Sequence, residues 1–135
     1  MNDEVLDFMI AGIIGLLGWF FGGMDGYIKV LIAFSVIDYI SGVFKAGAEG
    51  KISSAVGFKG IARKVLMFSL VGIAHLIDQF LPGEKDAFRI AIILFYIGNE
   101  GISIVENSDK LGVKIPKFLR GKFLKFTEHN EEKNT

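Results

Sequence analysis

Five polar residues stand inside runs of apolar sequence, and their types are those that carry chemistry in proteins: Asp38, His75, Asp78, Asn99 and Glu100. Imidazole and carboxylate groups bind metals, but no HExxH pattern or second nearby His accompanies them here. The chain has no Cys and no Gly-rich phosphate loop following a strand. We therefore predict no catalytic residue, no metal site and no cofactor, and the protein is not expected to be an enzyme.

The spacing of polar residues near Glu100 matches one face of a helix. Tyr96, Glu100, Ser103 and Asn107 recur at i, i+4, i+7 and i+11, and His75 shares a face with Asp78. A charged side chain at mid-bilayer costs about 2.5 to 3.5 kcal/mol on insertion scales, so each needs a partner or water. The sequence leaves three interpretations open: hydrogen bonds between helices, a proton or ion pathway, or the wet face of an oligomeric pore.

Four apolar segments must position these residues, at 8–24, 27–46, 65–81 and 87–105. Composition is 51% hydrophobic with mean hydropathy +0.46 and 13 Phe. Each segment would reach roughly 25 to 30 Å as a helix, about the hydrocarbon thickness of a bilayer. Helices of a soluble bundle should instead show a charged face at every turn. We predict an all-α, polytopic integral membrane protein with three firm spans, whereas the first segment either crosses or lies along the interface.

The charges predict an orientation. Residues 45–64 are predicted to form a loop between the second and third segments and hold five basic residues and one acid. Basic residues also follow Glu106, so both regions are expected in the cytoplasm. The turn at 82–89 has no net bias and can face outward. We predict a transmembrane domain at 1–107 and a basic cytoplasmic tail at 108–135. Within the tail, Pro116 can start a short interfacial helix held by anionic headgroups, although a solvated tail is an alternative.

Small residues form a stripe on the first segment. Its members recur at i, i+4, i+7 and i+11: Ala11, Gly15, Gly18 and Gly22. Such stripes let helix backbones approach closely in lipid, so we expect this segment to pair with another helix. The alternative is that Gly is merely common in membrane helices.

Two stretches, "SSAVGFKGIARKVLM" (53–67) and "NEGISIVENSDKLGVKIPKFLRGK" (99–122), together with "DYISG" (38–42), carry a resemblance. The pattern resembles the phage lysis and toxin-secretion holin family of Gram-positive hosts, also called holin family 4. It covers roughly residues 30 to 122. The positions matching its motif are Asp38, Ser54, Gly57, Gly60, Arg63, Lys64, Glu100, Ser103, Asn107 and Pro116.

The resemblance implies a protein that accumulates in the bacterial cytoplasmic membrane, self-associates and forms lesions at a set time. Endolysin, or a leaderless toxin, then leaves the cytoplasm. The implied partners are membrane lipids and other copies of the chain, with endolysin a functional partner not in direct contact; no nucleic acid is expected. The residues alone also allow a small proton-coupled ion or drug transporter using Glu100, or an antiholin or membrane anchor.

Overall fold

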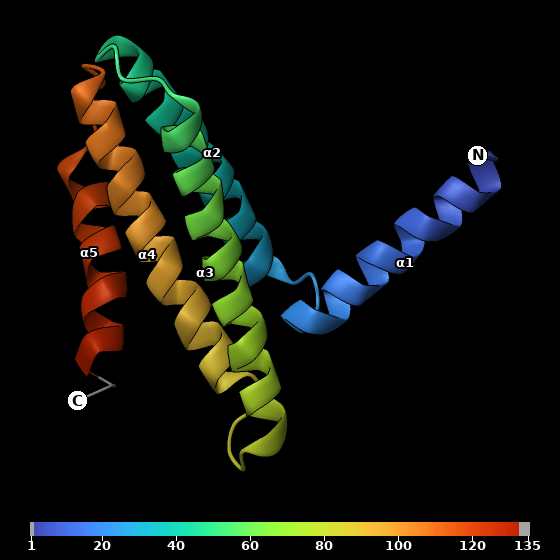
Figure 1. The fold of residues 1–135 in the computed structure, drawn as a ribbon. Helices are drawn as coiled ribbons and strands as arrows, with labels where there is room; N and C mark the ends of the chain where they lie inside the picture. The colour runs from blue at the N-terminus through green and yellow to red at the C-terminus, as the bar shows by residue number, and fades with distance from the viewer. Residues whose placement is uncertain (1, 133–135) are drawn as a thin grey trace.

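The computed structural model describes residues 2–132, and their side chains as far as Lys125. Within that range the chain is helical without strands, which confirms the predicted all-α class. The helices are α1 (Asp3–Phe21), α2 (Gly26–Ala48), α3 (Ser54–Phe80), α4 (Ala87–Lys110) and α5 (Lys117–Glu132). Figure 1 shows α2, α3 and α4 lying side by side as a bundle, with α5 running back along α4.

Helix α3 begins well before the predicted apolar segment at 65–81. Ser53 caps it, its side chain accepting a hydrogen bond from the Val56 N–H at 3.2 Å. Most of the predicted loop at 45–64 is therefore helical, and the prediction of a loop there was wrong. Hydropathy detects only the apolar part of a helix, whereas the cap and the following good helix formers decide where α3 starts. In the same way, α4 continues to Lys110, past the predicted boundary at residue 107.

The bundle core lies where α2, α3 and α4 meet. It is built from pairs of buried apolar residues on the three helices: Ile28, Leu31, Met67, Val71, Ile93 and Ile97. Since α4 contacts α2, α3 and α5, it is the central element of the structure. Any side chain on the α4 face toward α2 and α3 is thus held within reach of both.

Helix α1 stands away from the bundle in Figure 1 and has no buried residue. It is anchored at its last turn, where the Phe20 ring lies on Gly72 of α3 and Phe21 packs on Phe68 with 5.9 Å between ring centroids. A Cβ at Gly72 would come within 2.1 Å of the Phe20 ring, so only Gly leaves room for this contact.

The small-residue stripe on α1 has no partner within the described chain. A Cβ added at Gly15 or Gly18 would meet nothing within 4 Å. Gly22 lies one position beyond the helix, with a left-handed φ of 78°, so it ends α1 and does not extend the stripe. Pairing of Ala11, Gly15 and Gly18 with another helix stays a prediction.

Helix α5 was predicted to lie in the membrane interface, and the structure corrects its position. The helix packs lengthwise on α4, where the Phe123 ring covers Gly101 and meets Phe34 of α2 at 5.8 Å between centroids. Gly101 explains the difference, because a Cβ there would come within 2.7 Å of the Phe123 ring. Because Gly101 has no side chain, the Phe123 ring can pack directly on the backbone of α4, and hydropathy does not reveal this contact.

Helices α1 to α4 are each long and apolar enough to cross a membrane. Large apolar side chains cover their outer surfaces, and some are almost fully exposed, such as Phe8 at 82% and Phe80 at 85%. Exposed apolar surface on this scale is unfavourable in water but suits hydrocarbon. The outward face of the bundle is therefore a lipid-facing one.

Candidate functional site

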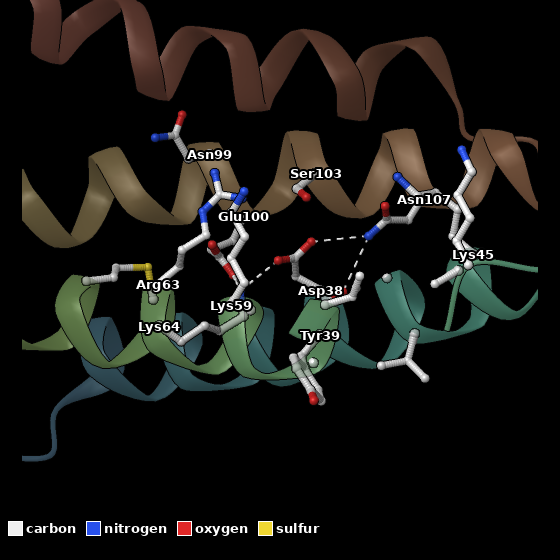
Figure 2. Close-up of a pocket in the computed structure, with 18 of the residues that line it drawn as sticks. Asp38, Tyr39, Lys45, Lys59, Arg63, Lys64, Asn99, Glu100, Ser103 and Asn107 are labelled. Carbon is white, nitrogen blue, oxygen red and sulfur yellow. Dashed lines mark hydrogen bonds and ion pairs between the residues drawn. The ribbon is translucent and has the colours of Figure 1, made fainter. Parts of the chain in front are cut away.

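A charged cluster joins the three bundle helices. Asp38 of α2, Lys64 of α3 and Glu100 of α4 each contribute one side chain (Figure 2). The Lys64 ammonium lies 2.6 Å from Asp38 Oδ2 and also donates to Glu100 Oε2. The three side chains are only 13 to 18% exposed. Charged side chains in an apolar layer require partners of opposite charge, and these shielded ion pairs provide them.

Asn107 extends the charged cluster along α4. Its amide donates to Asp38 Oδ1 at 3.2 Å and to Ser41 Oγ at 3.0 Å, and the residue is 6% exposed. Ser41 in turn donates to the Asp38 carbonyl at 3.0 Å. Both carboxylate oxygens of Asp38 are therefore occupied, one by Lys64 and the other by Asn107.

The charged cluster lies deep within the helices. Asp38, Lys64 and Glu100 each stand ten residues from the helix end on the side where α2 ends and α3 begins, here called the α2–α3 end. At 1.5 Å per residue this is about 15 Å from the helix ends, inside a hydrocarbon layer of about 30 Å. Two carboxylates face one ammonium there. The formal charge does not cancel, so one further proton or cation, or water, is needed to satisfy the group fully.

A groove of about 1050 Å³ opens beside the charged cluster, between α2, α3 and α4. Its lining includes the predicted polar residues of α4, namely Tyr96, Asn99, Glu100, Ser103 and Asn107, together with Asp38. The structure thus brings these six residues to one groove, whereas helical spacing predicted a shared face only for Tyr96, Glu100, Ser103 and Asn107. Besides Lys64, four basic residues line the same groove: Lys45, Lys51, Lys59 and Arg63.

The Gly-x-x-Gly pattern on α3 seats an aromatic ring. A Cβ at Gly57 would lie 3.4 Å from Tyr39 Oη, and one at Gly60 would lie 3.2 Å from Tyr39 Cε2. Tyr39 of α2 therefore packs against the bare backbone of α3. This contact sets the spacing of α2 and α3 at the groove, so the motif has a structural role in shaping it.

His75 and Asp78 lie apart from the charged cluster, toward the other end of α3. Both carboxylate oxygens of Asp78 accept backbone N–H groups at the start of α4, from Phe88 at 3.0 Å and Arg89 at 2.8 Å. His75 Nδ1 is 3.8 Å from Asp86 Oδ1. The structure therefore gives Asp78 a capping role and does not place either residue with Glu100.

Sequence reasoning missed Arg89, which it assigned to the outer turn. Its side chain is fully buried and donates to the Phe21 and Gly23 carbonyls and to both carboxylate oxygens of Asp25, the shorter contact being 2.7 Å. Partial burial acts to raise the pKa of Asp25, but hydrogen bonds from Arg89 and from the Ile28 N–H outweigh it and hold this pKa below 3.8. Arg89 thus fastens the α1–α2 connection to α4.

The partner of the two buried acids was also missed. Lys64 was predicted to belong to a loop, although two carboxylates inside apolar segments required a cation. Lys64 adjoins the third apolar segment and was the signal available in the sequence. Its role became visible only with α3 extended back to Ser54.

Comparisons with known proteins agree with this architecture. The bacteriophage holin family matches residues 15–128. An uncharacterized protein of Listeria monocytogenes is 44% identical over 130 residues, covering 96% of this chain and 92% of the relative. An uncharacterized protein of Bacillus subtilis is 37% identical over 114 residues, with 84% and 80% covered.

A further relative has an assigned role. A probable holin of Bacillus phage phi105 is 35% identical over 107 residues, with 79% of this chain and 78% of the relative covered. No solved structure matches the chain. The family match spans the bundle, the charged cluster and most of α5, and it confirms the resemblance carried by the motifs. This chain is therefore a multi-pass membrane protein belonging to the bacteriophage holin family.

Proposed function

We propose that this protein is the holin of a lysis system in the bacterial cytoplasmic membrane, where it self-associates and forms timed lesions. Through these lesions an endolysin, or a leaderless toxin, leaves the cytoplasm without binding the holin directly. The observation that carries the proposal is the charged cluster of Asp38, Lys64 and Glu100, which lies about 15 Å inside the helices.

The charged cluster can favour two states of the membrane. In a sealed bilayer its side chains satisfy one another, leaving one formal negative charge in excess. In an open lesion, water reaches the groove and hydrates all three groups. The burial cost is then relieved, so opening is self-stabilising once enough copies have gathered. A fall in membrane potential would assist, since moving one charge across the field is worth about 2.3 kcal/mol per 100 mV.

Self-association is supported by the outer surfaces of the helices. Helix α1 buries no residue within the chain, and its Gly15 and Gly18 positions are unobstructed. As copies accumulate, close packing of such helices competes with lipid contact. Assembly that depends on density would give lysis a delay followed by an abrupt onset.

The orientation belongs to the same proposal. The basic connection between α2 and α3 and the start of α5 lie at one end of the bundle in Figure 1. We place this end in the cytoplasm by the positive-inside rule, together with the first residues of the tail 108–135, since α5 then packs back along α4. A reporter that is active only outside the membrane should stay silent when inserted between Lys51 and Ile52 in the α2–α3 connection, and an active reporter would reverse the orientation.

Expression in bacteria with and without a cytoplasmic endolysin tests the function. A holin should stop growth abruptly at a reproducible time by itself and clear the culture when the endolysin is present. Intact, growing cells would favour a transporter. Delay of a second, established holin without any permeabilisation would identify an antiholin instead.

A further inference from the structure

Three cations surround the groove without a partner. Among the side chains that the structure describes, Lys45, Lys59 and Arg63 form no ion pair or side-chain hydrogen bond, although each lines the groove beside the charged cluster. Lys59 and Arg63 are one helical turn apart on α3 and point to the same side. Cationic side chains near a helix end extend toward the headgroup layer, where phosphates lie.

The groove changes character along α3. Beyond the basic residues, its wall is formed by Leu66, Met67 and Leu70, and the apolar part of its lining exceeds the polar part. Leu70 stands eleven residues further along α3 than Lys59, which is about 16 Å deeper at 1.5 Å per residue. The acyl chains of one leaflet extend about 15 Å, half of the hydrocarbon thickness, below the headgroup layer. The groove therefore has a cationic mouth and an apolar interior spaced like one lipid.

We propose that the groove is a binding site for one anionic glycerophospholipid. Its phosphate lies near Lys59, with the Arg63 side chain extending toward it and Lys45 across the groove, and an acyl chain follows α3 toward Leu70. Basic pockets between membrane helices recognise anionic headgroups in this way. The bound lipid supplies negative charge near Arg63, keeps water from the charged cluster, and makes the sealed state sensitive to lipid composition.

Charge favours a lipid over a second copy of the chain as the occupant. Of the described carboxylates at this end, Glu49 pairs with Lys51 and Asp109 pairs with Arg120, whereas Glu106 forms no ion pair. A second copy would have to bring one of its unpaired acids, such as Glu106 or Asp3, to the mouth of the groove. Lipid phosphates are present at this level all around the protein. The proposal needs only the membrane setting, and binding does not require that the lesion form.

Tryptophan quenching by brominated lipids tests the site on the full chain. The chain has one Trp, Trp19 on α1. A Leu70→Trp, Trp19→Phe variant is reconstituted in phosphatidylcholine vesicles containing a few per cent of dibrominated phosphatidylglycerol or dibrominated phosphatidylcholine. The brominated anionic lipid should reach half-maximal quenching of the introduced indole at a mole fraction at least about tenfold lower than brominated phosphatidylcholine does. The parent's Trp19, outside the groove, should show no preference beyond about twofold.

Charge variants identify the source of the preference. Lys59→Gln with Arg63→Gln in the quenching variant should reduce the preference about tenfold or more, as about 1 kcal/mol per basic residue implies. The matched control, Lys117→Gln with Lys122→Gln on α5, removes the same charge outside the groove and should change it less than twofold. Should Leu70→Trp fail to fold, Leu66→Trp on the same wall serves as the probe.

Three results would overturn the proposal. Equal quenching of the groove probe by both lipids would exclude an anionic-lipid site. Equal loss of preference in both charge variants would assign it to the general surface charge. If the groove variant instead weakens crosslinking between copies and leaves quenching unchanged, the occupant is a second chain. Lysis timing is measured separately, so a failed lipid site and a failed holin function are distinguishable.

Discussion

Removing the cation and removing one acid of the charged cluster should shift lysis in opposite directions. Lys64→Met keeps the length of the side chain but leaves Asp38 and Glu100 facing each other without their common partner. Glu100→Leu leaves Lys64 and Asp38 as a one-to-one pair. We expect the first variant to lyse early, and the second to lyse late or not at all, with membrane insertion unchanged in both.

The magnitude follows from the burial of the charged cluster. Removing one partner of a buried ion pair typically costs 3 to 5 kcal/mol, because the remaining charge is left uncompensated. These side chains are 13 to 18% exposed, so we take the lower limit, about 3 kcal/mol. That energy changes the equilibrium between sealed and open states about 100-fold. Glu100→Leu removes a mid-bilayer carboxylate and favours the sealed state by a similar amount, about 2.5 to 3.5 kcal/mol.

The assay is the time of lysis after induction in bacteria that also express a cytoplasmic endolysin. Culture absorbance gives the time, and immunoblots of membrane fractions confirm equal accumulation of each variant. Lys29→Met is the matched control, because it makes the same substitution at an exposed position near the opposite end of α2. The double variant Lys64→Met, Glu100→Leu has the parent's formal charge in the cluster, so its lysis time should fall between those of the single variants.

The reasoning has two clear points of failure. If Lys64→Met and Glu100→Leu shift lysis in the same direction at equal protein levels, burial of the charged cluster does not set the balance between sealed and open states. If Lys29→Met matches Lys64→Met, loss of any positive charge explains the effect, and the depth of Lys64 is irrelevant.

Four further predictions concern packing and pH. Gly101→Val should displace α5 from α4, because a side chain at this position overlaps the Phe123 ring. Trypsin should then cleave within α5 faster in detergent, and an unchanged cleavage rate would contradict the packing of Phe123 on Gly101. Gly15→Leu with Gly18→Leu should weaken self-association and shift lysis time, whereas crosslinking ladders identical to the parent's would exclude the stripe as an interface. Arg89→Met should lower the stability of the detergent-solubilised protein by about 3 kcal/mol. Because the pKa of Asp25 is lowered in the folded protein, this carboxylate stabilises the fold above pH 3.8, and the stabilisation is lost as pH falls through the folded pKa. The thermal unfolding temperature of Asp25→Asn should therefore depend less on pH in that range than the parent's does.

Helical spacing predicted the polar face of α4 correctly, because residues three and four apart on one helix meet regardless of what surrounds them. Tyr96, Glu100, Ser103 and Asn107 line one groove as their sequence positions require. The same local rule, applied to α1, placed Gly22 in a helical stripe. It failed there because the chain leaves the helix at Gly22 with a left-handed φ.

Local sequence patterns did not predict which residues of different helices contact each other. Arg89 adjoins an outer turn in the sequence, yet it is fully buried against Asp25, which lies 64 residues away. Helical spacing places His75 and Asp78 on one face of their helix but does not show what that face meets. In the structure their neighbours are Asp86 and the first turn of α4. Each of these outcomes depends on which helix ends meet, and hydropathy carries no such information.

The sequence by itself determined that the chain has four apolar helices, where the polar residues fall on them, and the charge asymmetry that suggests an orientation, because these depend on composition and helical period. Only the tertiary structure decided that Lys64 joins Asp38 and Glu100, that Tyr39 rests on Gly57 and Gly60, and that α5 lies on Gly101. The physical reason is that burial and ion pairing are properties of surfaces brought together by folding. The same residue types at the same spacings would stay unpaired if the helices met along different faces.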